Sequence, residues 1–364
     1  MNRFACLGCA LLFLGGSAQA IQAAFVNGDL VILTTSDNTS TSADAITLND
    51  YPYNPLTGTF GTTPTSHVLT GLTLPGLNDH DGMLRVTTNG NDLVFGGYQA
   101  AVGTPTVIAS SATRAIGLVD SNWNLTTTPI TGYSGVALRS VVSTDGQHFW
   151  TGGDQGTDGG QYYINASGPA TQTQITANDA RANQIVDGQL WGFSSSNAGT
   201  EIGSGLPTSA AAATIAMNSP FVKSDAVFLD LNHDGTSDTA YSTDGKNLLG
   251  KWNFDGTNWN LTGQWTGTKA DINNINSLEA FVFNGKIELL AATQQGQLFQ
   301  FTDANGISPN FDPAFLANTA PTPFLSMPSE SFRGMAITVP EPASVALLAL
   351  AIPCLLGFRR WRSR

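Results

Sequence analysis

The stretch with the clearest chemical potential is a short acidic loop, DLNHDGTSD, at residues 230–238. Oxygen-bearing side chains alternate along it, and a glycine stands where such a loop must turn sharply. The candidate ligands are Asp230, Asn232, Asp234, a backbone carbonyl near Thr236, and Asp238. Because oxygen donors at alternate positions let one short segment wrap a hard cation, the spacing predicts a structural Ca²⁺ site. The alternative is an ordinary acidic hairpin turn, since Asn, Asp and Gly are common turn residues.

The flanking sequence distinguishes this loop from a helical calcium motif. An EF-hand needs Glu at the twelfth loop position, where this chain has Tyr241, and strand-like runs flank the loop. The loop is similar to the calcium loops of FG-GAP repeats in integrin-type β-propellers, where it joins two strands of one blade. The resemblance covers about a dozen residues of a single repeat. It implies structural calcium in a propeller-like body.

No other stretch has the spacing of a catalytic or metal motif. The four histidines show no H-x-x-x-H type of spacing, and the sequence has no nucleophile-elbow, phosphate-loop or dinucleotide-binding fingerprint. A carboxylate pair for glycoside hydrolysis could still assemble from distant positions. The tryptophans of the body are either sugar-stacking platforms or, more commonly, core aromatics.

The segment that contains this loop, residues 25–338, has repeated sequence signals for β-hairpins. Apolar runs are joined in pairs across Asn-Gly or Asp-Gly turns, whose residues tolerate the positive φ of the tightest hairpins. The four turns are Asn89-Gly90, Asp145-Gly146, Asp187-Gly188 and Asn284-Gly285. Residues 25–338 show no sustained helical periodicity, so the body is predicted to be all-β.

These hairpins recur at a regular spacing. The first strands of successive units are anchored at Leu84, Leu138, Ala182, Ala226, Leu278 and Phe332, giving intervals of 54, 44, 44, 52 and 54 residues. A period of about 50 residues with three or four strands per unit is typical of a β-propeller.

The ends of the body supply one unit between them. FRGMAIT is a lone strand after the last anchor, and NGDLVILTT near the N-terminus lacks a preceding strand. Pairing the two predicts a propeller of six blades closed by the N- and C-terminal strands, with room for a seventh blade in residues 35–80. A large β-sandwich and a β-solenoid are the alternatives.

The first 20 residues are typical of a secretory signal peptide. Arg3 precedes an apolar stretch, and Ala18-Gln19-Ala20 forms an A-x-A cleavage site. We therefore expect cleavage after Ala20 and a propeller domain over residues 21–338. Acylation of Cys9, as in a lipoprotein, is the alternative.

An apolar run at the other end, residues 343–358, is predicted to form a transmembrane helix. As a helix it spans roughly 24 Å, somewhat less than the ~30 Å hydrocarbon core, and Trp361 can extend it at the interface. Four arginines follow, and Arg359 and Arg360 come first as a membrane stop that places this end in the cytoplasm. The alternative, a buried C-terminal helix, leaves the arginines without acidic neighbours.

The junction before this run carries a specific pattern. Val339 precedes Pro340, Glu341 and Pro342, and the apolar run and the arginines follow in order. This arrangement over residues 339–364 resembles the PEP-CTERM sorting signal of exported bacterial proteins, which an exosortase-type enzyme processes at the tripeptide. Two prolines keep such a segment extended and accessible at the membrane face. The resemblance implies a membrane-anchored or released protein, frequently from bacteria that make exopolysaccharide.

The charge of the body limits which molecules it can bind, and its cysteine content determines whether it can form a disulfide. The formal net charge is −12, and without the charged terminal residues the body has 10 Lys and Arg against 26 Asp and Glu. Such a surface repels phosphates, so neither DNA nor RNA is expected to bind. The cysteines, Cys6, Cys9 and Cys354, all lie in the terminal segments, so the body has no disulfide.

Two functions fit these observations. The first is a non-enzymatic binding or structural role at the cell envelope or in an extracellular matrix, in contact with polysaccharide or surface proteins. The second is a propeller hydrolase or lyase acting on extracellular polysaccharide or a lactone. An enzyme should carry acids or histidines at the central axis, whereas an apolar or Ser/Thr/Asn-lined axis favours binding. Because no catalytic motif is present, the first is favoured.

Overall fold

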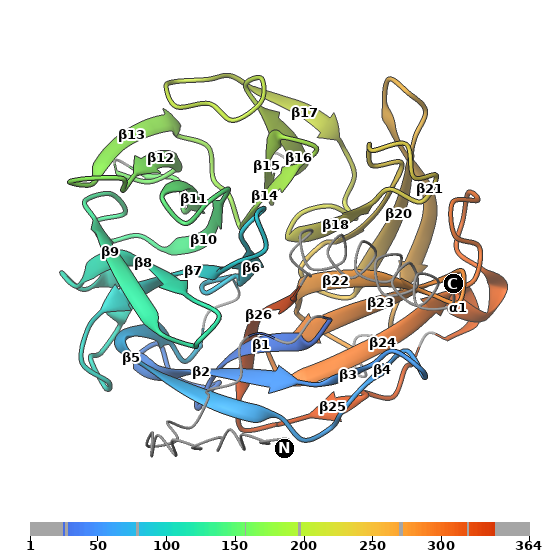
Figure 1. Cartoon of the computed structure of the whole chain (residues 1–364), viewed down its shortest axis with the longest axis horizontal. Helices are drawn as coiled ribbons and strands as arrows, with labels where there is room; N and C mark the ends of the chain where they lie inside the picture. Colours follow the sequence, from blue (N-terminus) through green and yellow to red (C-terminus); the bar gives the residue numbers. More distant parts are fainter. Residues whose placement is uncertain are drawn as a thin grey trace, which may run out of the picture.

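The computed structural model describes residues 25, 28–77, 80–156, 158–195, 198–268, 272–318 and 320–338. These residues form antiparallel sheets that stand around a central axis like the blades of a propeller (Figure 1). The described part also contains one short α-helix, α1 (Pro313–Ala317), and one 3-10 turn, η1 (Val107–Ala109). The prediction of an all-β body is confirmed, and the arrangement around an axis excludes a two-layer sandwich and a solenoid.

Four sheets contain four strands each, in the order of the sequence. The first is β10 (Leu138–Ser143), β11 (His148–Gly153), β12 (Gln161–Asn165) and β13 (Thr171–Thr176). The second is β14 (Ala182–Val186), β15 (Gln189–Ser194), β16 (Ala198–Ile202) and β17 (Ala213–Met217). The third is β18 (Asp225–Leu229), β19 (Thr239–Thr243), β20 (Leu248–Phe254) and β21 (Trp259–Thr266). The fourth is β22 (Ile275–Phe283), β23 (Lys286–Thr293), β24 (Gln297–Asp303) and β25 (Leu325–Ser326).

The fifth large sheet has eight strands and combines both ends of the body. Along its path run β26 (Ser331–Ile337), β1 (Leu30–Thr35), β2 (Ala43–Tyr51), β5 (Thr65–Pro75), β7 (Leu93–Gln99), β8 (Thr113–Val119) and β9 (Leu125–Ile130), while β6 (Arg85–Val86) pairs with β7. A single residue pair, Thr73 with Tyr98, joins β5 to β7. A small separate hairpin consists of β3 (Tyr53–Asn54) and β4 (Thr59–Phe60).

The predicted pairing of the two ends is present. Strand β26 pairs antiparallel with β1, from Leu30 opposite Ile337 to Thr35 opposite Ser331. Each of the six sequence anchors lies on, or directly before, the first strand of its unit, namely β6, β10, β14, β18, β22 and β26. The described part of residues 35–80 holds β2, β5 and the β3–β4 hairpin rather than a separate four-stranded sheet.

The tight-turn signals are confirmed in two of four places. The two-residue turns 187–188 and 284–285 have positive φ at both positions and join β14 to β15 and β22 to β23. The turns around Asn89 and Asp145 are longer, because side chains at these places form hydrogen bonds with other residues of the turn. Asn89 Oδ1 accepts from Thr87 Oγ1 at 2.6 Å, and Ser143 Oγ accepts from Gly146 N at 3.0 Å. Such local bonds compete with the two-residue turn.

Apolar side chains fill the spaces between neighbouring sheets. In one such core, Val94 and Ile116 of the β7–β8 hairpin pack with Val141, Phe149 and Ile164 of the next sheet, and none is more than 1% exposed. Burial of this kind is the main stabilising contribution to folding. It matters more in a body whose sequence contains no cysteine between residues 21 and 338.

The membrane prediction concerns residues beyond this description. Within the described ranges, no helix is both long enough and apolar enough to cross a bilayer. The predicted span at 343–358, the signal peptide at 1–20, the Pro340–Pro342 motif and the Arg359–Arg360 stop lie outside the described residues.

Candidate functional site

The acidic loop 230–238 joins β18 to β19, so strands flank it as predicted. Its side chains bond to its own backbone. Asp230 accepts from the N–H groups of Asp234 (3.2 Å) and Gly235 (2.9 Å), and Asp234 Oδ1 accepts from Thr236 N at 2.9 Å and Thr236 Oγ1 at 2.6 Å. The two bonds from Thr236 lower the pKa of Asp234, so this carboxylate stays ionised.

The loop has the donor types for calcium, but its carboxylates do not converge. Asp238 faces back into the protein, where its Oδ2 accepts from the N–H groups of Leu231 (3.0 Å) and Asn232 (2.8 Å). Within the described residues, no group of three or more His, Cys, Asp or Glu side chains is placed to hold a metal ion. In this conformation the loop is a self-bonded acidic turn, and a cation would require Asp230 and Asp234 to turn toward a common centre.

Residues 80–85 lie at the central axis and lead into β6, which Figure 1 shows near the centre. Met83 is fully buried, and its N–H donates to the carbonyl of Arg139 on β10 at 3.1 Å. A Cβ at Gly334 of β26 would collide with the backbone nitrogen of Leu84. This segment, hereafter the axial segment, therefore fills the middle of the axis and separates its two ends.

A cavity of about 360 Å³ lies on one side of the axial segment. This size is within the range of small-ligand pockets. All six first strands, or the residues next to them, contribute to its lining. Its apolar walls are Val86, Val142, Ile185, Val186, Val227, Phe228, Leu278 and Ile337. We call this cavity the axial pocket.

Arg85 on β6 lines the axial pocket and belongs to a buried ion pair. Its guanidinium pairs with the carboxylate of Asp225 on β18, which lies outside the lining. Asp225 also accepts from Leu278 N at 3.0 Å and from Gln184 Nε2 at 3.1 Å. Burial raises the pKa of Asp225, while the guanidinium and these N–H donors oppose the rise.

Glu279 on β22 adds a carboxyl to the lining, in addition to that of Asp187. Burial raises its pKa to about 8, with a further rise from Asp225 that Arg85 opposes. The side chain keeps some accessible surface, which faces the pocket. No hydrogen bond joins the Glu279 carboxyl to any residue that the structure describes. At neutral pH it therefore carries a proton and can both donate and accept a hydrogen bond.

The acidic loop and the axial pocket are neighbours. Ser237 in the loop donates its N–H to Asp187 Oδ2 at 2.8 Å, and its hydroxyl lies 3.2 Å from Asp187 Oδ1. Both residues line the pocket. The loop predicted from the sequence thus contributes to the rim of a site that the sequence did not reveal.

A different charged cluster occupies the other side of the axial segment. Arg139 pairs with Asp179 at 2.6 Å and with Asp154, beside a cavity of about 250 Å³. Buried His80 lies with its Nδ1 3.2 Å from Ser224 Oγ, and burial, together with nearby arginines, lowers the pKa of His80 well below its usual value. Asp81 accepts from Tyr98 OH at 2.7 Å, and burial raises its pKa to about 6. The axis therefore carries acids and a histidine, which the enzyme hypothesis requires.

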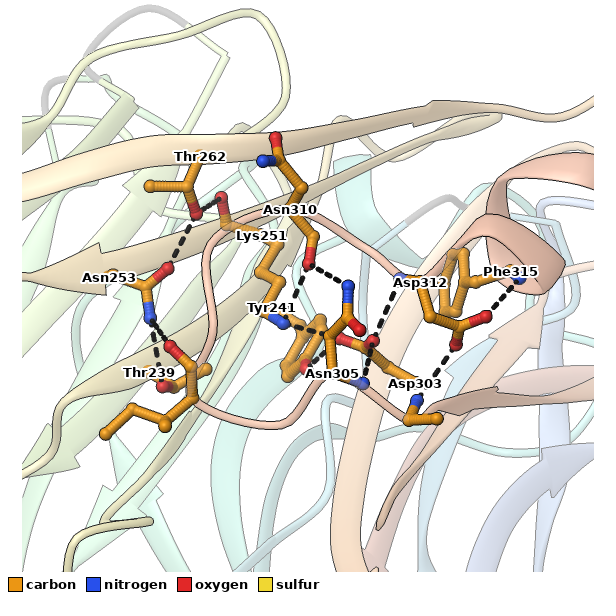
Figure 2. Close-up of polar contacts among 12 residues, drawn as sticks. Thr239, Tyr241, Lys251, Asn253, Thr262, Asp303, Asn305, Asn310, Asp312 and Phe315 are labelled. Atoms are coloured by element: carbon orange, nitrogen blue, oxygen red, sulfur yellow. Dashed lines mark hydrogen bonds and ion pairs between the residues drawn. The ribbon is translucent and has the colours of Figure 1, made fainter.

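A third buried charge pair lies away from the axis, between two sheets (Figure 2). Lys251 on β20 and Asp303 at the end of β24 are both fully buried and 2.7 Å apart. Tyr241 OH donates to Asp303 Oδ2 at 2.6 Å, and Lys251 also donates to the carbonyl of Asn310 at 3.1 Å. The second oxygen, Asp303 Oδ1, accepts from the backbone N–H of Asp312 at 3.1 Å. This cluster fastens the segment before α1 to the sheets.

The aromatic residues considered from the sequence are mainly core residues. Five of the six tryptophans are at most 7% exposed: Trp123, Trp150, Trp191, Trp252 and Trp265. Trp259 is half-buried and packs edge-on against Phe228, whose ring lines the axial pocket.

The residues at the axial pocket were missed because each is a lone charge far from the others in sequence. Arg85, Asp225 and Glu279 stand in the stretches MLRVTT, SDAVFLD and SLEAFVF. A single charge inside the first apolar strand of a unit was the available signal, because such strands face the axis of a propeller.

Comparisons with known proteins bear on the fold alone. No family model matches the chain, and no curated protein sequence matches it significantly. A nidogen–laminin complex is similar with a TM-score of 0.49 and 10% identity, over 85% of this chain and 98% of that chain. A candidate 6-phosphogluconolactonase from Bacteroides uniformis has a TM-score of 0.45 and 13% identity, over 82% of each chain. A similar protein from Bacteroides fragilis has a TM-score of 0.44 and 11% identity, over 85% of this chain and 98% of that chain. At these values the likenesses carry no argument about function.

Proposed function

We propose that the protein is an exported six-bladed β-propeller that binds a small ligand in its axial pocket. The observation that carries this proposal is the pocket itself, a cavity of about 360 Å³ lined from all six first strands. Inside it, Glu279 has no hydrogen-bond partner among the described residues. Its carboxyl keeps accessible surface toward the cavity, so a bound ligand can form hydrogen bonds with it.

Six blades follow from dividing the eight-stranded sheet in two. One half is β26, β1, β2 and β5, and the other is β6, β7, β8 and β9. The single residue pair between β5 and β7 supports this division. With the four other sheets the count is six, and the first strand of each unit then lies next to the axis.

Export and anchoring follow from the terminal segments. The signal peptide, the Pro340–Pro342 motif and the Arg359–Arg360 stop support delivery to the envelope, with processing by an exosortase-type enzyme. Mass spectrometry of the chain from cells and medium tests this. Loss of everything after about residue 339 supports processing, and an intact Arg364 in the membrane fraction makes the tail a permanent anchor. An intact chain in the cytoplasm would overturn export.

Calcium in loop 230–238 belongs to the same proposal as a structural clamp. The alternating oxygen donors support it, and the loop borders the axial pocket through Ser237 and Asp187. A bound cation would fix that rim, and its removal should reduce stability before it affects the rest of the body.

The ligand-binding proposal is tested by filling the pocket. Val227 lines it and is half-buried, so Val227→Trp should occupy its volume, while Val282→Trp changes an exposed valine on a neighbouring strand. A thermal-shift screen of mono- and oligosaccharides and lactones should find compounds that stabilise the parent and Val282→Trp but not Val227→Trp. Equal stabilisation of all three proteins, or none of the parent, would overturn axial binding.

The second candidate is a hydrolase, favoured by the two carboxyls in the lining of the axial pocket, those of Glu279 and Asp187. Glu279 is protonated at neutral pH, as a general acid must be. Release of product from chromogenic glycosides or a lactone, with loss in Glu279→Gln, would establish this activity. Turnover that is equal in that variant would exclude Glu279 as its acid.

A further inference from the structure

The one cation in the described lining of the axial pocket is already paired without a ligand. Arg85 is committed to Asp225 and to the backbone carbonyl of Leu84 at 3.4 Å, so the pair contributes no net charge. Glu279 is neutral near pH 7, since burial and Asp225 both disfavour its ionised form. An anionic ligand would therefore find no uncommitted cation in the described lining, and the carboxylate of Asp187 at the rim already accepts from the N–H and hydroxyl of Ser237.

We propose that the axial pocket takes an uncharged ligand that carries hydroxyl groups on a compact apolar ring, such as one sugar residue, and that the carboxyl of Glu279 in the lining binds its hydroxyls. The inference rests on the proposed axial ligand site and names the class of ligand. A neutral carboxyl donates one hydrogen bond and accepts others, which matches the donor and acceptor character of an adjacent hydroxyl pair.

The rest of the lining fits the same class of ligand. Half-buried Val227 and Phe228 offer apolar surface to the C–H groups of a ring. Thr88, Ser143 and Ser237 supply hydroxyl groups to the lining. Few polar groups on mainly apolar walls are the usual composition of a pocket for a small ligand.

Ionisation of Glu279 should weaken this binding. The ionisable groups that face it are Arg85 on β6, Asp225 on β18 and Asp187 at the β14–β15 turn, while the described residues of β10 and β26 in the lining are uncharged. Above about pH 8 Glu279 loses its proton donor and gains a charge beside Asp225. Affinity for a neutral ligand should then fall, whereas affinity for a cation should rise.

The test compares three probes with similar alkyl arms: butyl β-glucoside, hexanoate and hexylamine. Calorimetric titration at about pH 6.5 and pH 9 should show that the parent binds the glucoside best at the lower pH and about tenfold more weakly at the higher, as expected for a required group with a pKa of about 8. Glu279→Gln keeps a donor and an acceptor, so it should bind the glucoside with little dependence on pH. Glu279→Leu should not bind it.

The matched control is Glu288→Gln, which changes a buried glutamate outside the axial pocket and should retain the fall with pH. Tighter binding of hexylamine with affinity rising with pH would overturn the inference, as would a retained pH dependence in Glu279→Gln. Failure of all three probes overturns this ligand class. The Val227→Trp screen then decides separately whether the pocket binds a ligand at all.

Discussion

Two buried ion pairs in this protein have opposite surroundings. Lys251 and Asp303 are enclosed by the protein, which supplies Asp303 with bonds from Tyr241 OH and the backbone N–H of Asp312. Arg85 and Asp225 are also buried, yet Arg85 lines a cavity together with Glu279, whose carboxyl bonds to no residue that the structure describes. The first pair is bonded within the protein alone, whereas the second adjoins a carboxyl that a ligand can reach.

The comparison distinguishes charged groups that stabilise the fold, such as Lys251 and Asp303, from groups at the axial pocket that are available to the ligand we propose. A buried ion pair that is hydrogen-bonded by the surrounding protein holds together the elements that carry it. Removing one partner leaves an uncompensated buried charge. A carboxyl that faces a cavity and bonds to no described residue, as Glu279 does, is a feature that folding alone does not require. The four predictions that follow probe this distinction, from the largest expected effect to the smallest.

The fastening pair should be the most sensitive site. Asp303→Ala leaves Lys251 charged and unpaired and removes the acceptor for Tyr241, so the free energy of unfolding should fall by about 3–5 kcal/mol. Urea denaturation measures this, with Lys286→Met, at an exposed lysine, as the control. A loss no larger than that of the control would contradict the fastening role.

The axial pair should cost less to break. In Arg85→Met, Asp225 keeps bonds from Leu278 N and Gln184, so we expect a loss of about 1–3 kcal/mol in urea denaturation. Because Arg85 opposes the rise in the pKa of Glu279, its removal should move that pKa further above 8. Carboxyl NMR titration follows this shift, and an unchanged Glu279 pKa would show that the guanidinium does not act on it.

Stability should depend on pH through Glu279. Its folded pKa of about 8 exceeds the ordinary value of 4.5, so the native state binds the extra proton and the free energy of unfolding falls as pH rises from about 4.5 to 8. The slope is at most about 1.4 kcal/mol per pH unit. Glu279→Gln should flatten the decline between about pH 6.5 and 8. Asp50 and Asp81, with pKa values of about 6, titrate mainly below this window. Identical slopes in parent and variant would contradict the assignment.

The acidic loop should give the smallest effect. If it binds calcium, EDTA lowers the melting temperature, added calcium restores it, and Asp234→Ala is insensitive to both. The control is Asp255→Ala, which changes another exposed turn aspartate that accepts backbone N–H bonds from Thr257 and Asn258. Parent and Asp234→Ala responding alike would make the loop a turn only.

The sequence predicted those features that depend on local chemistry. Apolar runs marked the first strand of every unit, and an Asn-Gly or Asp-Gly turn followed in four of the six. The lone strands at the two ends were expected to pair, as β26 and β1 do. The length of the turns at Asn89 and Asp145 was not predicted, because it depends on side-chain bonds within the turn. The acidic loop was located between strands, but the orientation of its carboxylates depends on bonds that spacing does not encode.

The axial pocket was beyond the reach of the sequence for a different reason. Arg85 and Asp225 are 140 residues apart, and they meet only because the axial segment crosses between sheets. Lys251 and Asp303 are 52 residues apart and likewise meet only through packing. Neither pair has a spacing rule, so each becomes visible only when the arrangement of the sheets is known.

The pairing of β26 with β1 also bears on the timing of assembly. The first strand must wait for residues that are synthesised some 300 positions later, so the body cannot complete its fold on a partly made chain. A chain whose propeller cannot close before its C-terminal strand has been synthesised can still be threaded through a channel. This delay is compatible with the export that we propose, in which the chain passes a narrow translocation channel before it becomes compact.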